Sequence, residues 1–118
     1  MMEPLEIPTV NLEYGKPFVA DALDRLNEEL IYAKQSGTRV IKFIHGYGSS
    51  GKGGRIKAAV QEELELRKNW GDILTFVKGE DFSPFTETGR ELLYACPASA
   101  KDSDYCRGNP GVSIVVLW

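Results

Sequence analysis

The order of apolar and polar residues changes its period several times along this chain. Apolar residues recur at three- and four-residue steps over residues 17–36 and again over 54–68, which predicts two amphipathic helices. Period-two alternation or short apolar runs predict four strands, over residues 5–14, 39–44, 72–77 and 112–118. The last of these strands, VSIVVLW, is almost wholly apolar and is therefore expected to be buried.

The stretch between the third and fourth predicted strands has a weaker pattern. Residues 86–96 predict a short helix with Leu92 and Leu93 facing inward, and residues 97–111 consist largely of turn-forming residues. The predicted order is β-α-β-α-β-(α)-β, in which right-handed crossovers build a parallel or mixed sheet. With two long helices, the sequence predicts an α/β fold in the form of a two-layer sandwich, as one domain over residues 1–118.

Composition and charge fit a soluble globular domain. The chain has 118 residues, of which 42% are hydrophobic and 26% are charged, and its formal net charge is −3. No apolar run approaches the roughly 18 residues that span a bilayer, and the first residues lack the basic start and apolar stretch of a signal peptide. We therefore expect a cytoplasmic protein that makes no membrane contact. Because the body is acidic, any site for a polyanion must be a local cationic patch.

Two cysteines and one histidine limit the metal and redox chemistry. Cys96 and Cys106 lie in a turn-rich stretch, and without an export signal they are expected to be reduced, with a loop disulfide or a redox pair as alternatives. A single histidine and the lack of a C-x-x-C motif argue against a zinc site. The sequence predicts no cofactor, while a divalent metal for phosphodiester cleavage stays open.

The most informative segment is the glycine-rich stretch that joins the second predicted strand to the second predicted helix. Glycines allow positive φ angles and close approach of the backbone to a ligand, and a helix amino terminus offers unpaired N–H groups. Cations cluster in the same segment. We therefore predict a site for phosphate or another anion, formed by Gly46, Tyr47, Gly48, Gly51, Lys52, Gly53, Gly54, Arg55 and Lys57.

Part of this segment matches a nucleotide-binding P-loop, but the match is incomplete. Gly46, Gly51 and Lys52 have the P-loop spacing, whereas Gly53 stands where the motif needs a serine or threonine to ligate magnesium. No apolar strand ends directly in an acidic residue that could hold the metal. These departures argue against a nucleotide hydrolase.

His45 is the only histidine, and it directly follows the second predicted strand. The carboxyl end of a strand is where open α/β sheets bind ligands. His45 could contact phosphate or transfer a proton near neutral pH, and it could equally pin the loop by hydrogen bonding. Tyr47 could stack on a base or pack against the following helix. The residues alone leave these alternatives open.

Several segments, taken in order, resemble the Smr (small MutS-related) domain family. The run VIKFIHGYG at 40–48 resembles the central H-G-x-G motif of the family, and VNLE at 10–13 lies where the family carries an L-D-x-H-type motif. A long helix with an E-A-L-like stretch at 20–23 follows, and GNPGVSIVVL at 108–117 resembles the closing G-x-G-V-T-x-V-x-L strand. The resemblance covers most of the chain and is loose between about residues 79 and 107.

This resemblance implies a two-layer α/β sandwich similar to the C-terminal domain of bacterial translation initiation factor 3, with DNA or RNA as the partner. It also implies endonuclease activity, which several members of the family have. The H-G-x-G motif maps onto His45, Gly46 and Gly48, whereas Asn11 and Glu13 stand at the acidic and histidine positions of the family. Glu13 is the candidate catalytic partner of His45, with a solvent-facing carboxylate as the alternative.

Three hypotheses follow for the function. The first is a nucleic-acid-binding domain that holds phosphates at the glycine-rich loop, and the second adds endonucleolytic cleavage with His45 as acid or base. The third is a protein-interaction or small-anion-binding module without catalysis, for which segment 79–111 could supply the partner surface. The sequence does not distinguish DNA from RNA, and it does not give the oligomeric state.

Overall fold

A computed structural model describes residues 7–48 and 53–118 of the chain. The helices are α1 (Val19–Gln35), α2 (Gly53–Asn69) and α3 (Glu87–Ala95), with two 3₁₀ turns, η1 (Gly79–Asp81) and η2 (Pro97–Lys101). The strands are β1 (Thr9–Asn11), β2 (Val40–Ile44), β3 (Thr75–Lys78) and β4 (Val112–Val116). The predicted order of elements is confirmed, including the short third helix.

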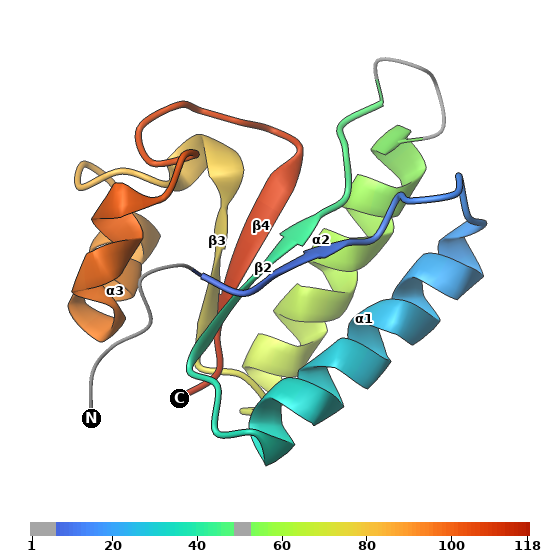
Figure 1. The fold of residues 1–118 in the computed structure, drawn as a ribbon, viewed down its shortest axis with the longest axis horizontal. Helices are drawn as coiled ribbons and strands as arrows, with labels where there is room; N and C mark the ends of the chain where they lie inside the picture. The colour runs from blue at the N-terminus through green and yellow to red at the C-terminus, as the bar shows by residue number, and fades with distance from the viewer. Residues whose placement is uncertain (1–6, 49–52) are drawn as a thin grey trace.

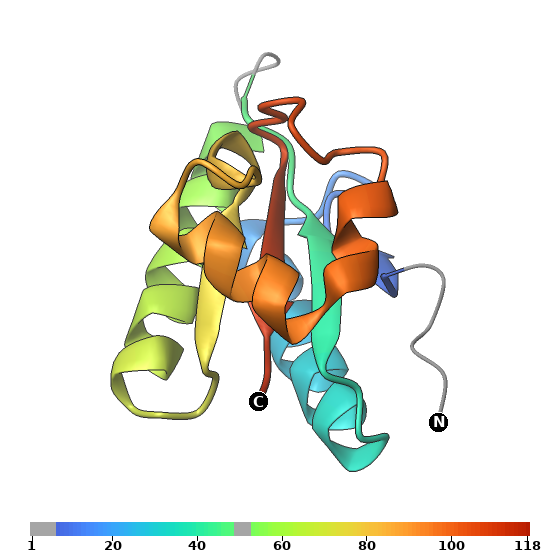
Figure 2. The ribbon, with the colours of Figure 1, turned by 90° about the vertical axis from the view of Figure 1, so that its left-hand side faces the viewer.

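The four strands form one mixed sheet in the order β1-β2-β4-β3. β1 pairs with β2 in parallel, and β4 lies antiparallel to both β2 and β3. Helices α1 and α2 cover one face of the sheet, whereas α3 lies against the other face (Figure 1 and Figure 2). The α/β class is therefore confirmed, and α3 adds a partial layer on the face that the two long helices leave open.

Alternation along the central strands divides the core between these two faces. Ile41 and Phe43 of β2 belong to the cluster beneath α1 and α2, whereas Val40 belongs to the cluster beneath α3. In β4, Val115 joins the first cluster and Ile114 joins the second. Because both faces are covered, every residue of β4 is buried, as its apolar composition predicted.

The first strand is shorter than the prediction over 5–14. β1 ends at Asn11, whose Oδ1 accepts a hydrogen bond from Glu13 N at 3.0 Å and turns the chain. Gly15 and Lys16 follow with φ angles of 78° and 51°, which do not occur in a strand. The strand position predicted for Tyr14 is therefore wrong, because Tyr14 lies in this turn and is exposed. Residues 5 and 6 of the predicted strand lie outside the described residues.

Segment 79–111 packs against the sheet through a short capped helix. Thr86 Oγ1 accepts a hydrogen bond from Gly89 N at 3.0 Å and so begins α3. Leu92 is buried in the cluster beneath α3. Cys96 is buried, Cys106 is exposed, and no disulfide joins the two. This segment therefore packs against the second face of the sheet and supplies Phe82, Leu92, Ala95 and Cys96 to the core there.

Candidate functional site

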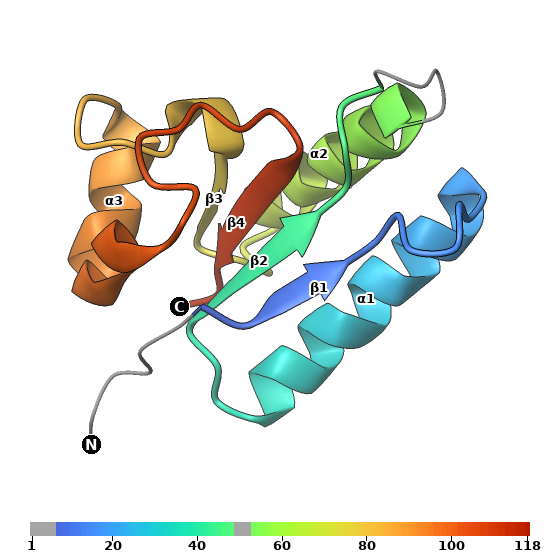
Figure 3. The same cartoon turned by 45° about the horizontal axis from the view of Figure 1, so that its top comes forward.

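Four segments meet at the edge of the sheet where β1 and β2 end (Figure 3). They are the turn after β1, the loop at residues 45–48, the turn before β4 and the first turn of α2. We call residues 45–48 the HGYG loop. His45 N and Gly46 N both donate to Gly111 O, at 2.9 and 3.1 Å, and these bonds hold the loop against the turn before β4.

A contact between Gly46 and Glu13 joins the two segments that the sequence selected. Gly46 has a φ of 72°, in the left-handed region that favours glycine. The Glu13 carboxylate covers its Cα and occupies the space that a Cβ would need. Glu13 is half-buried, and its carboxylate has no hydrogen bond or ion pair with another residue in the described part of the chain.

The His45 side chain is wholly buried and bonded at both ring nitrogens. Nδ1 lies 2.7 Å from Gly46 O, and since a carbonyl only accepts, Nδ1 carries the ring proton. Nε2 therefore accepts from Ser113 Oγ at 2.9 Å, and Ser113 Oγ accepts in turn from Gln61 Nε2 at 3.2 Å. The ring thus connects the HGYG loop with β4 and α2.

These surroundings also set the charge of His45. Burial lowers the pKa of the imidazole below its ordinary value, and the Lys57 ammonium lowers it further. The hydrogen bond to Gly46 O and the charge of Glu80 act in the opposite direction and do not offset the burial. His45 is therefore neutral at pH 7. This geometry favours the loop-pinning role over the proton-transfer role.

The three cations predicted for the site have different surroundings. Lys52 lies outside the described residues, as does Gly51. Lys57 Nζ donates to Glu80 Oε2 at 2.8 Å, in an ion pair that is partly exposed. Arg55, in the first turn of α2, is exposed and pairs with no residue of the described ranges. Of these three cations, Lys52 is not described and Lys57 is paired, so Arg55 is the one that the structure shows to be available to an external anion.

Two further cations, which sequence analysis did not select, lie at the same edge. Lys78 is the exposed last residue of β3 and pairs in the sheet with Ser113, the residue that bonds His45. Lys16 is exposed in the turn after β1, where its N–H donates to Glu13 O at 3.1 Å. The position of Lys78, directly after a predicted strand, was the available signal, because ligands gather at strand ends.

The amino end of α2 lies directly against the HGYG loop. A Cβ on Gly54 would lie 3.7 Å from Gly48 Cα and 3.9 Å from Tyr47 O. The first N–H groups of a helix have no partner within the helix, so this end of α2 provides donors for a ligand. Tyr47 is 56% exposed, although its ring lies near Gly111, where a Cβ would be 3.4 Å from Tyr47 Cδ1.

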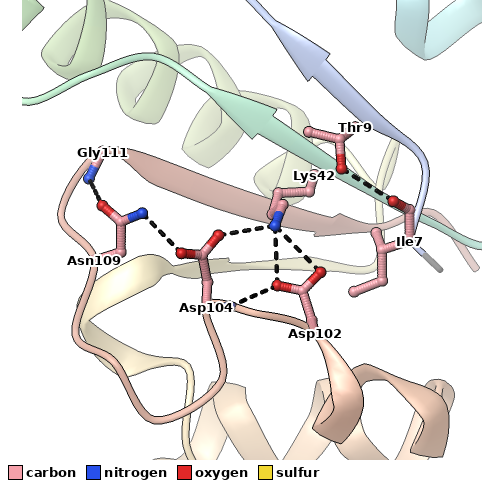
Figure 4. A network of polar contacts seen from close by, with 7 residues as sticks. All are labelled: Ile7, Thr9, Lys42, Asp102, Asp104, Asn109 and Gly111. Carbon is pink, nitrogen blue, oxygen red and sulfur yellow. Dashed lines mark hydrogen bonds and ion pairs between the residues drawn. The ribbon is translucent and has the colours of Figure 1, made fainter.

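A buried lysine behind the loop was missed by sequence analysis. Lys42 is 6% exposed, and its Nζ donates to Asp102 Oδ1 at 2.9 Å and to Asp104 Oδ2 at 2.8 Å (Figure 4). Asp104 Oδ1 also accepts from Asn109 Nδ2 at 2.8 Å, and Asn109 Oδ1 accepts from Gly111 N at 2.9 Å. We call these five residues the Lys42 network. The signal was a lysine in the otherwise apolar strand VIKFI.

The Lys42 network fixes the turn that holds the HGYG loop. Burial on its own would lower the pKa of Lys42, but the hydrogen bonds to Asp104 and Asp102 raise it above the ordinary value. Lys42 is therefore charged and bound to both carboxylates. Because Gly111 O accepts from His45 N and Gly46 N, the network is continuous with the loop.

Neither the pattern of a multi-ligand metal site nor that of a membrane-spanning helix is found in residues 7–48 and 53–118. No three or more histidine, cysteine, aspartate or glutamate side chains of these residues are placed to hold a metal ion together. No helix in the same ranges is both long enough and apolar enough to cross a membrane.

A mixed sheet in the order β1-β2-β4-β3, with two long helices on one face and an H-G-x-G loop after β2, defines this structure as an Smr-like α/β domain. It is similar to the crystal structure of the Smr domain of Thermus thermophilus MutS2, with a TM-score of 0.58 and 20% sequence identity. The similarity covers 95% of this chain and 99% of the other. No protein-family model matches the chain, and neither does any curated protein. The resemblance to Smr domains is thus confirmed at the level of the fold.

Proposed function

We propose that this chain is a nucleic-acid-binding domain that holds a phosphate backbone at the HGYG loop and the amino end of α2. Arg55 carries the proposal, because it is exposed, pairs with no described residue and lies in the first turn of α2. The Smr-like fold supports it, since nucleic-acid binding is what the resemblance to that family implies.

The chemistry of this edge suits a phosphate diester. Backbone N–H groups at a helix start bind anionic oxygens, and an arginine beside them can donate two parallel hydrogen bonds. Lys16 and Lys78 add positive charge at the same edge. A phosphate could also compete for Lys57, because Glu80, its partner, has a 42% exposed side chain and exposed pairs are weak.

In the proposed nucleic-acid binding, His45 has a structural role and does not contact the ligand. Both ring nitrogens of His45 are occupied within the protein, so the ring does not present a proton donor or acceptor to a ligand. Glu13 is the remaining catalytic candidate, as a half-buried carboxylate beside Gly46. Segment 79–111 is the alternative partner surface. Most of its apolar residues pack against the sheet and are not available to a protein partner.

Charge reversal at Arg55 tests this proposal. Arg55→Glu should weaken binding of a fluorescent single-stranded oligonucleotide by about tenfold or more at low salt, measured by fluorescence anisotropy. The substitution places an acidic residue in the first turn of α2, where the helix dipole favours it, so the variant should fold at least as well as the wild type.

Lys68→Glu is the matched control. Lys68 is exposed on the same helix, about 20 Å along its axis from Arg55. Its substitution by glutamate changes the net charge by the same amount as Arg55→Glu. We expect it to bind almost as the wild type does. Equal effects of the two substitutions, or no binding by the wild type, would show that the edge is not a nucleic-acid site.

A further inference from the structure

Three exposed aromatic side chains lie on the segments that leave β1 and β2. Tyr14 is 80% exposed, Phe18 is 81% exposed and Tyr47 is 56% exposed. Single exposed aromatic residues are common on protein surfaces and need no explanation. Several at one edge of a sheet, beside a candidate binding loop, are typical of an interaction site.

The strand register places Tyr14 and Tyr47 at the same edge. Asn11 of β1 pairs with Ile44 of β2 in parallel, and each tyrosine follows its strand partner by three residues. Paired strands lie about 4.8 Å apart, so the two segments leave the sheet next to each other. The Glu13 carboxylate lies against Gly46, so the two segments are still next to each other beyond the strand ends.

Phe18 lies largely in solvent at a position where a polar side chain would cap a helix. It is the N-cap residue of α1, and its side chain makes no capping hydrogen bond. Serine, threonine, aspartate or asparagine at this position would stabilise the helix, typically by about 1 kcal/mol. An apolar ring that is left in solvent at such a position points to a role in binding.

Two exposed cations lie on the same segments as these rings or on the adjoining turn of α2. Lys16 is exposed between Tyr14 and Phe18 in the chain, and its φ of 51° belongs to the same turn. Arg55 is exposed in the first turn of α2, next to Gly54, which lies against the Tyr47 backbone. Rings that stack on bases and cations that track the phosphates are the combination that single-stranded nucleic acid requires.

We propose that this edge binds unpaired nucleotides, with bases stacked on Tyr14, Phe18 and Tyr47 and phosphates held by Arg55 and Lys16. The inference rests on the proposed nucleic-acid binding and adds the class of ligand. The faces of bases within a duplex are already stacked on each other, so the three rings would gain little from double-stranded nucleic acid. Single-stranded RNA or DNA, or an unpaired stretch in either, is therefore the ligand.

Truncation of the rings tests this inference. The variant Tyr14→Ala/Phe18→Ala/Tyr47→Ala and the wild type are titrated with labelled oligo-U, oligo-dT and a blunt duplex, each about 15 units long, a length that spans a typical single-strand site. We expect the wild type to prefer the single strands. The triple variant should lose at least about tenfold in single-strand affinity, because stacking makes a large contribution per base. Its duplex binding should stay unchanged.

Two control variants separate stacking from folding and from general loss of aromatic surface. Tyr32→Ala/Phe85→Ala/Tyr94→Ala likewise removes two tyrosine rings and one phenylalanine ring, from exposed positions in the last turn of α1 and on or beside α3. It should bind as the wild type does. Tyr14→Phe/Tyr47→Phe keeps the rings and removes the hydroxyls, and should also retain single-strand binding.

The outcomes distinguish this inference from the proposed function. If Arg55→Glu weakens binding while the ring-truncated variant binds single strands as the wild type does, the edge binds nucleic acid and the stacking inference is overturned. Tighter binding of the duplex than of both single strands by the wild type would overturn it as well. Failure of the wild type to bind any of the three probes would overturn both proposals.

Discussion

The His45 imidazole is neutral and enclosed, and its bonds connect three elements of the site. Its ring reaches Gly46 O in the loop and Ser113 on β4, and through Ser113 it reaches Gln61 on α2. A protonated ring would have no proton acceptor site at Nε2 and could no longer accept from Ser113. The position of the HGYG loop should therefore depend on the charge of this residue.

The stability of the protein should fall as the pH drops from 7 to about 5. The folded state keeps His45 neutral because burial lowers its pKa, whereas the unfolded chain binds a proton as the pH passes about 6.5. Proton uptake then favours unfolding, with a limiting slope of about 1.4 kcal/mol per pH unit. The stabilisation is therefore complete above about pH 6.5. It is lost as the pH falls from there to the lower pKa of His45 in the folded state. Urea unfolding at a series of pH values measures this slope.

His45→Asn is the control for this pH dependence. Asparagine can still donate to the Gly46 carbonyl but does not titrate, and the chain has no second histidine. The variant should be less stable at pH 7 and should have a flatter profile between pH 7 and about 5. Parallel profiles for the two proteins would contradict the neutral, buried His45 described here.

At the scale of elements, the Lys42 network fastens segment 79–111 to the central strand β2. Asp102 and Asp104 follow η2, and Asn109 leads into the turn before β4. Their shared cation lies on the sheet beneath them, in the strand that ends at the HGYG loop. The layer on the second face and the candidate site are therefore positioned by the same side chains.

Lys42→Met should destabilise the protein by about 3 kcal/mol, measured by urea unfolding. The substitution keeps the apolar stem but leaves two largely buried carboxylates without their cation, and an uncompensated buried charge is costly. The variant Lys42→Met/Asp102→Asn/Asp104→Asn removes all three charges and should recover part of the loss.

Lys34→Met provides the comparison for a surface pair. Lys34 pairs with Asp72, and both side chains are about one-third exposed. We expect a loss of at most about 1 kcal/mol, because exposed ion pairs contribute little. A similar loss in Lys42→Met would mean that the Lys42 network does not fasten the segment.

The whole molecule is acidic, and its candidate ligand site is a small cationic region at one edge. The net charge is −3, while the described cations of the edge are Lys16, Arg55, Lys57 and Lys78. Because Lys57 is paired with Glu80, contacts from the other three predict a slope of about −2 for log K against log salt on a single strand. Binding should therefore be modest at physiological salt and stronger in dilute buffer.

Glu80→Gln should strengthen single-strand binding a few-fold and steepen the slope of log K against log salt by about 0.7. The substitution releases Lys57 from its ion pair and makes its ammonium available to a phosphate. Titrations at several salt concentrations measure both quantities. Glu65→Gln, at an exposed position farther along α2, changes the net charge equally and should leave the slope unchanged. The same slope in both variants would place Lys57 outside the ligand site.

Local pattern was sufficient for the elements and for the choice of a candidate loop. Helices and strands have different periods of apolar residues, so α1, α2, β2 and β4 could be predicted to within a few residues. β1 was predicted too long, because the side chain of Asn11 turns the chain where the alternation continues. The glycine-rich segment was also visible, since glycine content and the position after a strand are local properties.

The sequence by itself determined the order of elements, the apolar character of both faces of β4 and the candidate loop at residues 45–48. Only the tertiary structure decided the state of the side chains in that loop and around it. The ring of buried His45 is bonded by Ser113, 68 residues away, and Lys57 is paired with Glu80, 23 residues away. Such partners have no periodic relation in the chain. They come together only when the sheet closes and brings distant segments to one edge.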